Sequence, residues 1–503
     1  MKVPEIFHHF EYFTKEDFKL FGKYLKSPYF NTINAYSDIY EIILKNLKYI
    51  NLRDYRGLRD IIIKSQICSE STTLKLLSNL SDFVLGYFKQ RALEKETFIG
   101  ELHLCESLLS KGYFNALHKR ILLCQDSIIT EDKFDEDVYL NYFQLDYLKY
   151  RISMLTDSKF HGEQAITDQQ ELTLDSSKNL FVFSLVRITI NYLNYVIQNV
   201  DTSNKNPTHY PVELEPMFGI IKSKDFDLYD KYQKALILLY NTLFLAFRNL
   251  NNDTAYVNYK TNFLRIKNLF NESFSKTHYS ILMNYCNIRQ RLNDKDLKYG
   301  IEGAKVLNDY IREEMYKDEV NQYLPPIYYR NFIIKCNTAE SKKILKEFIE
   351  EQTKKLHEVH YEDLSNFGYA HYYYLNNEYG KAFKRINNLK NTQFMYKYDI
   401  RNLELKIHYE KENYEWMESI LHNYQETIKK ENIFTQNDKT RYKLQVYYLK
   451  KLNNTREKYK LNGKIIEVEH LKNKIITELN FVMKKWMLEK IDELITKHYE
   501  DKK

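Results

Sequence analysis

The chain has 503 residues, a formal net charge of +7 and a hydrophobic content of 44%, which excludes a disordered chain. Its 12 glycines and 7 prolines are about a third of average usage, so tight turns and strand boundaries are few. We therefore expect an all-α protein of long helices joined by short polar turns, with negligible sheet. The length suffices for several domains or one continuous helical array.

Five cysteines occur at wide spacing, and no Cys-x-x-Cys pair is present. They are Cys68, Cys105, Cys124, Cys286 and Cys336. An odd number without close pairs argues against a disulfide framework or a zinc site, and it favours buried free thiols in a reducing compartment. The N-terminal residues lack the apolar core of a secretory signal. We expect a cytoplasmic protein.

Near the N-terminus, a short motif has the composition of a corner between two helices. Ser27-Pro28 is predicted to end a helix, because the residue before proline disfavours the helical conformation. Asn31 is predicted to cap the next helix, and Tyr29 and Phe30 to fill the corner between the two.

The regular helical pattern is interrupted around an apolar segment, 179–200. Residues 156–178 are polar, and 201–216 contain three of the seven prolines, so the main joint of the chain is expected here. The apolar segment carries Arg187 and several asparagines, which favours a buried helix over membrane insertion. Four regions follow: 1–155, an N-terminal helical region; 156–216, an irregular joint around the helix 179–200; 217–325, middle helical repeats; and 326–503, C-terminal repeats with a capping helix.

Two helical hairpins follow each other in residues 362–431. Tyr379 and Tyr414 are 35 residues apart, and so are Ala382 and Met417. A period near 34 residues is typical of tetratricopeptide-type helix pairs, which stack into a superhelix. The predicted fold is an all-α, tetratricopeptide-like α-solenoid of stacked antiparallel helix pairs. In the last helix, Trp486 lies on the apolar stripe of Met483, Met487 and Ile491, and we expect it to pack inward as part of a cap.

Three motifs resemble those of a large group of uncharacterised bacterial helical-repeat proteins. They are Lys26-Ser27-Pro28-Tyr29-Phe30-Asn31, Tyr329-Arg330-Asn331-Phe332 and Lys485-Trp486-Met487-Leu488-Glu489-Lys490-Ile491. Their order and spacing match over nearly the whole chain, most weakly in 156–320. The resemblance implies a tetratricopeptide-like all-helical fold and no assigned activity.

The chain carries no recognisable catalytic or cofactor motif. It has neither Gly-x-Gly-x-x-Gly nor Gly-Lys-Ser/Thr, and His357 and His360 are three residues apart where the metalloprotease motif needs four. We therefore expect no enzyme, no metal and no cofactor. The leading hypothesis is a non-catalytic scaffold or adaptor that binds a protein or peptide on the superhelix surface. The residues expected to face the binding groove are Asn366, Tyr369, Tyr373, Arg401 and Lys406.

A basic stretch supports an alternative function. Residues 436–464 contain nine Lys or Arg and two acidic residues, with tyrosines between them. Basic groups interleaved with aromatic rings can hold phosphates and stack bases. A nucleic-acid-binding solenoid would use Lys443, Tyr447, Lys450 and Lys451. A solvated lysine face explains the same stretch without a ligand. A regulator or enzyme with no recognisable motif is the second alternative.

Overall fold

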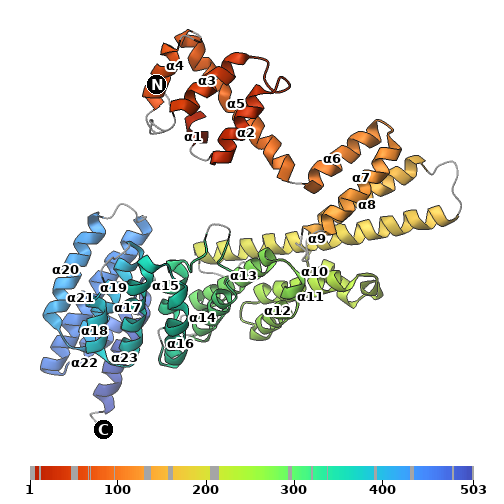
Figure 1. The fold of residues 1–503 in the computed structure, drawn as a ribbon. Helices are drawn as coiled ribbons and strands as arrows, with labels where there is room; N and C mark the ends of the chain where they lie inside the picture. Colours follow the sequence, from red (N-terminus) through yellow and green to blue (C-terminus); the bar gives the residue numbers. More distant parts are fainter. Residues whose placement is uncertain are drawn as a thin grey trace. The chain divides into compact units, whose positions relative to one another are not determined.

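The fold is that of a computed structural model (Figure 1). It describes residues 6–10, 13–46, 55–65, 67, 69–95, 97–129, 137–156, 163–203, 214–292, 297–318, 321–336, 338–389, 394–430, 436–478 and 481–500. This part of the chain is helical and contains no β-strand, which confirms the predicted all-α class.

Two compact units divide the chain, and the boundary between Phe181 and Val182 falls inside one helix, α9 (Glu163–Ser203). This helix has 41 residues and begins well before the apolar segment 179–200 (Figure 1). The structure thus differs from the predicted irregular joint over 163–178. Helix formers such as Gln, Glu and Leu are frequent in that stretch and glycine is lacking, so a helix forms despite its polarity, and residues 170–175 are mostly exposed. Of the three prolines of the joint, Pro207 and Pro211 lie outside the described residues, and Pro216 lies in α10 (Leu214–Phe218).

The first unit contains eight helices of the described chain and the start of α9. They are α1 (Ile6–Phe10), α2 (Lys15–Lys26), α3 (Asn34–Asn46), α4 (Tyr55–Lys64), α5 (Glu70–Lys95), α6 (Thr97–Ser110), α7 (Phe114–Ile129) and α8 (Val138–Thr156). The core of α1–α5 is rich in aromatic rings, with Phe10, Phe21, Tyr40 and Tyr87 buried against one another.

The corner between α2 and α3 partly matches its prediction. Ser27 is the C-cap of α2, as expected. Asn31 does not cap α3: its side chain donates to the Leu25 carbonyl and accepts from the Ile33 amide, so it holds the corner between the helices. Phe30 stacks on Tyr24 with ring centroids 4.4 Å apart. Tyr29 is 86% exposed, so the expectation that it fills the corner was wrong.

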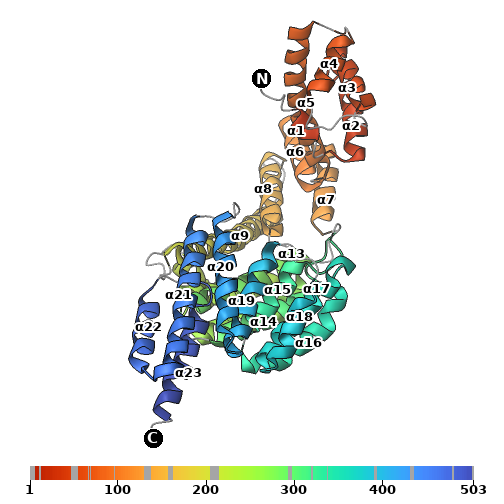
Figure 2. The same cartoon turned by 90° about the vertical axis from the view of Figure 1, so that its left-hand side faces the viewer.

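The second unit is built from the end of α9 and the helices after it. They are α10 (Leu214–Phe218), η1 (Gly219–Lys222), η2 (Lys224–Leu228), α11 (Lys231–Arg248), α12 (Asp253–Ile266), η3 (Lys267–Leu269), α13 (Glu272–Leu292), α14 (Leu297–Arg312), α15 (Pro326–Lys335), η4 (Ala339–Ser341), α16 (Lys342–Gln352), η5 (Thr353–Lys355), α17 (Glu358–Leu375), α18 (Tyr379–Asn387), α19 (Phe394–Glu410), α20 (Tyr414–Lys430), α21 (Gln436–Asn462), α22 (Ile465–Thr477) and α23 (Lys484–Glu500). Helices adjacent in sequence pack as neighbouring pairs, and α21, α22 and α23 lie side by side (Figure 2).

The 35-residue offset is repeated in the backbone of two helix pairs, α17/α18 and α19/α20. Asn377 and Glu412 both have φ of 60° in the turn between the helices. The next amide reaches back across the turn in both pairs, from Glu378 to the Tyr373 carbonyl and from Asn413 to the His408 carbonyl, at 2.9 and 3.0 Å. A residue with positive φ and this six-residue hydrogen bond define a Schellman ending. The predicted hairpins are therefore present, and α18 and α20 begin at Tyr379 and Tyr414.

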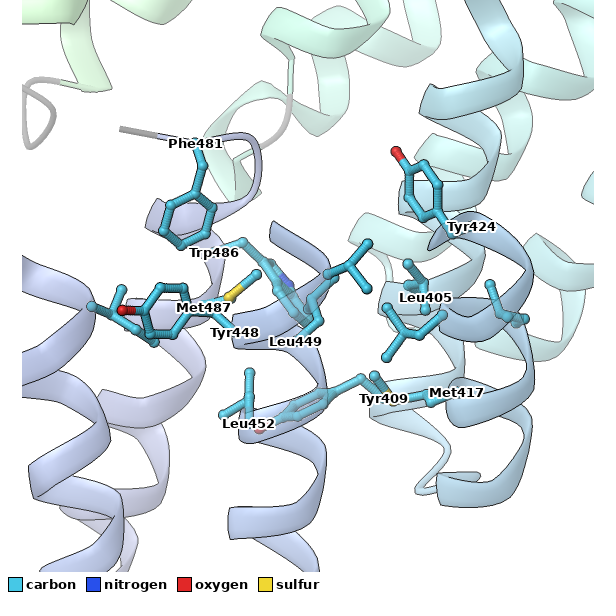
Figure 3. Packing of buried hydrophobic residues seen from close by; sticks show 14 of the residues in the cluster. Leu405, Tyr409, Met417, Tyr424, Tyr448, Leu449, Leu452, Phe481, Trp486 and Met487 are labelled. Carbon is cyan, nitrogen blue, oxygen red and sulfur yellow. The ribbon is translucent and has the colours of Figure 1, made fainter. Parts of the chain in front are cut away.

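The core of the last helix pairs includes Trp486, which is 7% exposed, as its stripe predicts. Figure 3 shows this side chain among Leu405 and Tyr409 of α19 and Leu449 and Leu452 of α21. The closing helix α23 is therefore joined to the helices before it by one continuous apolar cluster.

In the described residues, one helical segment, Gln169–Val200, is long and apolar enough by composition to cross a membrane. The part of this segment that belongs to the second unit buries one face: Val186, Leu193, Val196 and Val200 are buried, whereas Arg187 is exposed. A helix that packs one face against a folded domain has this distribution, and 39% of the apolar window is buried, so the segment is only in part the buried helix that was expected.

Candidate partner-binding face

Equivalent positions of α17 and α19 lie on one face, which we call the α23 face because α23 packs on it. His371 and Lys406 are 35 residues apart, as are Tyr374 and Tyr409. Both tyrosines contact the indole of Trp486. The Trp486 Nε1–H donates to the Tyr374 hydroxyl at 3.1 Å, and the Tyr409 ring meets the indole edge-on with centroids 5.1 Å apart. Trp486 of α23 is thus contacted by tyrosines at equivalent positions of two successive helix pairs.

A largely buried ion pair fixes α23 one turn further on. Lys490 Nζ lies 2.8 Å from Glu410 Oε1, and the two side chains are 15% and 14% exposed. Lys490 also pairs with Glu493 at 2.8 Å. Burial opposes the charge of Lys490, but hydrogen bonds to Glu410 and Glu493 outweigh it and raise the pKa of the ammonium. The contact therefore depends on both carboxylates being ionised.

Burial disfavours the charged forms of the side chains at the other repeated position, His371 and Lys406. It lowers the pKa of the buried His371 imidazole to about 3, helped by the positive charges of Lys406 and Arg330. His371 is therefore neutral at physiological pH, and its Nε2 lacks a hydrogen-bond partner among the described residues. Burial also lowers the pKa of the Lys406 ammonium to about 8, although Glu489 on α23 favours the charged form. The Lys406 Nζ lies 5.8 Å from the centroid of the Trp486 ring.

Polar contacts continue this face to the neighbouring helices. Arg330 of α15 makes a bidentate ion pair with Asp399 of α19, at 2.6 Å from Nε and 2.7 Å from Nη2. Asn402 Oδ1 accepts from Gln445 Nε2 of α21 at 2.6 Å and from the Tyr424 hydroxyl of α20 at 3.3 Å. Polar side chains thus tie α15, α19, α20 and α21 together.

Of the five residues predicted to face a groove, only Lys406 lies on the α23 face. Three lie against α18: Arg385 donates to Asn366 at 3.1 Å and covers the Tyr369 ring at 5.2 Å, while Lys381 lies 5.5 Å from the Tyr373 centroid. Arg401, 35 residues after Asn366, pairs with Glu404 at 3.5 Å. The sequence period locates these equivalent positions, but it does not say which face meets the helix partner. The side that holds His371 and Tyr374 was missed, although the offset from Lys406 and Tyr409 would have found it.

The four predicted nucleic-acid residues divide between two directions on α21. Lys443, Tyr447 and Lys451 are exposed at helical spacing, and Lys451 Nζ lies 5.7 Å from the Tyr447 centroid. Lys450 instead donates to Gln425 of α20 at 3.2 Å. The exposed basic stripe therefore consists of the first three residues without Lys450. It continues along the same surface to Lys458.

An open cleft lies elsewhere in the second unit, between α9 and the helices α13–α15, with a volume of about 520 Å³. Its polar and aromatic lining includes Asn194, Thr277, Ser280, Asn284, Tyr310 and Tyr328. The ammonium of Lys276, which also lines it, pairs with Glu272 at 2.6 Å and donates to the Lys317 carbonyl. The cleft thus offers hydroxyl and amide groups, with its one lining charge already engaged.

His357 caps the start of α17, where its Nδ1 accepts from the Val359 amide at 3.3 Å. In the described residues, no group of three or more His, Cys, Asp or Glu is arranged to hold a metal ion. Comparisons with protein-family models, curated proteins and solved structures found no match.

Proposed function

We propose that the protein is a non-catalytic scaffold of the cytoplasm, a tetratricopeptide-like α-solenoid that binds an extended, uncharged peptide segment of a partner protein. The proposal includes membership of the bacterial helical-repeat group that its three motifs resemble. The observation that carries it is the open cleft between α9 and α13–α15. A concave site with a few well-placed polar groups and apolar walls is the usual form of a binding site.

The lining of the cleft defines the segment that it fits. Thr277, Ser280 and Asn284 are spaced along α13 at intervals of three and four residues, so they present hydroxyl and amide groups on one helix face. These groups can pair with the carbonyl and amide groups of an extended backbone. Ile190 and Ile197 form apolar wall on the α9 side. A charged side chain in the partner would find no free counter-charge in this lining.

The α23 face supports the same general function. There, equivalent positions of two helix pairs hold one helix through an aromatic anchor and a buried ion pair. Packed helix pairs of this chain are thus able to bind a segment on their surface, and α23 uses this face itself. No residue of α23 lines the cleft.

A photo-crosslinking amino acid tests the cleft directly. Placed at Ser280, inside the cleft, it should give a discrete adduct in the native cell, whereas the same group at the exposed Lys305 should not. Asn284→Lys, which fills the cleft with a charged chain, should abolish the adduct at position 280 and leave the melting temperature unchanged. Equal adducts at both positions, or an adduct that persists in the Asn284→Lys protein, would contradict the proposal.

The second candidate function, nucleic-acid binding, is favoured by the shared exposure of Lys443, Tyr447 and Lys451. The double variant Lys443→Glu/Lys451→Glu should lose the phosphate contacts of both lysines. The slope of the logarithm of affinity against the logarithm of salt concentration should then become shallower by about two. Lys450→Glu is the matched control, because Lys450 donates to Gln425 and lies off the stripe. Fluorescence anisotropy with single-stranded and duplex oligonucleotides, at low and physiological salt, measures both. Absence of binding by the wild type at low salt excludes this function.

A further inference from the structure

Two cysteine thiols of the first unit face each other across a helical hairpin. Cys105 of α6 and Cys124 of α7 have their Sγ atoms 3.8 Å apart, and both side chains are fully buried. The hairpin turn contains Gly112 at φ of 72°, and the Tyr113 amide closes it on the Leu108 carbonyl at 3.0 Å. The two sulfurs are therefore held in contact by a turn of defined backbone geometry.

We propose that Cys105 and Cys124 are an oxidisable pair that forms an intramolecular disulfide cross-linking α6 to α7. A disulfide bond is about 2.05 Å long, so the two sulfur atoms must approach by less than about 2 Å, which side-chain rotation and small helix shifts supply. Both residues belong to the first unit and lie on adjacent helices. This site is independent of the proposed partner-binding cleft.

With hydrogen peroxide as the oxidant, the atoms and electrons balance in two steps. The thiolate of one cysteine attacks a peroxide oxygen, the O–O bond breaks, and a sulfenic acid and water result. The second sulfur then attacks the sulfenic sulfur, the S–O bond breaks, a second water leaves and the S–S bond forms. Two thiols are oxidised and one peroxide is reduced to two waters. A small neutral oxidant suits the site because both sulfurs are shielded from solvent.

Burial and neighbouring groups set the rate of attack. Burial raises the pKa of both thiols, that of Cys124 to about 12, while the contact between them lowers the pKa of Cys105 and raises that of Cys124. Glu101 of α6 raises both pKa values and Arg120 of α7 lowers them, and these two side chains pair at 3.1 Å. Because thiolate is the reactive form, cross-linking should be slow at neutral pH and accelerate roughly tenfold per pH unit above it.

The test is oxidation of the full chain by hydrogen peroxide or by diamide, followed by intact-mass measurement and peptide mapping. We expect a loss of two hydrogen atoms and a linked peptide that joins Cys105 to Cys124. The oxidised protein should also melt at a higher temperature, because the cross-link restricts the unfolded chain. Cys286→Ser removes a buried thiol of the second unit and should leave the linked peptide unchanged.

Cys105→Ala and Cys124→Ala should each abolish the linked peptide. If either variant does not fold, the presence or absence of the linked peptide in the wild-type map tests the proposal. Absence of the linked peptide in folded wild type at pH 9, or a Cys105 found joined to another cysteine, would overturn the proposal. Equal oxidation rates at pH 7 and pH 9 would overturn the proposed attack by a thiolate.

Discussion

The helix pairs α17/α18 and α19/α20 have the same backbone design and different side chains on the face that α23 covers. Their turns match in φ and in hydrogen bonding, at Asn377 and Glu412. At equivalent positions, tyrosine is retained (Tyr374 and Tyr409), whereas His371 is replaced by Lys406. The comparison teaches that the repeat determines where a side chain points, while the side chain itself determines the charge and the contact it makes.

The shared contact with Trp486 gives the largest expected effect. Trp486→Ala removes an indole that both tyrosines touch, and it should lower the free energy of unfolding by about 3–5 kcal/mol. Trp416→Ala is the control, because that indole is 63% exposed, and it should cost much less. Urea denaturation measures both. Equal costs, or a wild-type emission spectrum typical of two exposed indoles, would show that α23 is not held as described.

The replacement of His371 by Lys406 predicts two different pH windows in which stability changes, each on the order of 3–5 kcal/mol. The lowered pKa of folded His371, about 3 against 6.5, means that the unfolded state binds more protons between these values, so stability falls as pH drops through this window. The pKa of Lys406 is likewise lowered in the folded state, from 10.5 to about 8, so stability rises as pH increases through that window. His371→Phe should remove the acid dependence alone, and Lys406→Met the alkaline dependence alone. Thermal unfolding across pH measures this, and identical pH profiles for the two variants would refute the assignment.

At the next position of the face, Glu410 corresponds to Leu375 of the preceding pair. Glu410→Leu makes the two pairs alike and leaves the ammonium of Lys490 with Glu493 alone. It should cost about 1–3 kcal/mol, as expected when a buried charged group loses a hydrogen-bond partner. Glu493→Gln, at an exposed carboxylate, should cost little. If Glu410→Leu leaves the free energy of unfolding unchanged, the attraction within the ion pair only offsets the cost of its desolvation.

The matching turns give the smallest effect. Asn377→Ala places a less tolerant residue at positive φ and removes the acceptor of the Tyr379 hydroxyl, so it should cost about 1 kcal/mol. Asn388→Ala changes an exposed asparagine with an ordinary helical backbone and serves as the control. Equal melting temperatures for the two variants would indicate that the turn at Asn377 carries no strain.

The sequence predicted those features that rest on local chemistry. The scarcity of Gly and Pro gave the all-α class, the offset of Tyr379 and Tyr414 gave two helix starts, and the Trp486 stripe gave an inward-facing residue. Helix periodicity places residues relative to one another on a helix, but it does not identify the neighbour on each side. Asn366, Tyr369 and Tyr373 therefore lie against α18, while their unselected neighbour Tyr374 meets α23.

The cleft between α9 and α13–α15 was beyond sequence reasoning for a related reason. Its walls come from segments about 80 to 140 residues apart in the chain, and no local pattern connects Asn194 to Ser280 or Tyr328. The thiol contact of Cys105 and Cys124 depends likewise on the pairing of two helices. Cysteine spacing alone predicted separate buried thiols. The burial of both thiols is confirmed, but the spacing could not predict that they lie close together.

The position of the unit boundary inside α9 determines how the molecule can be cut. Proteases need an extended stretch of backbone, and the residues around Phe181 and Val182 are in the middle of a 41-residue helix. Limited digestion should therefore spare this boundary, although it separates two compact units. A fragment that ends there would expose Val186, Leu193 and Val196 of the remaining piece at a ragged helix start. Gene fragments meant to yield soluble halves should keep α9 whole with the second unit.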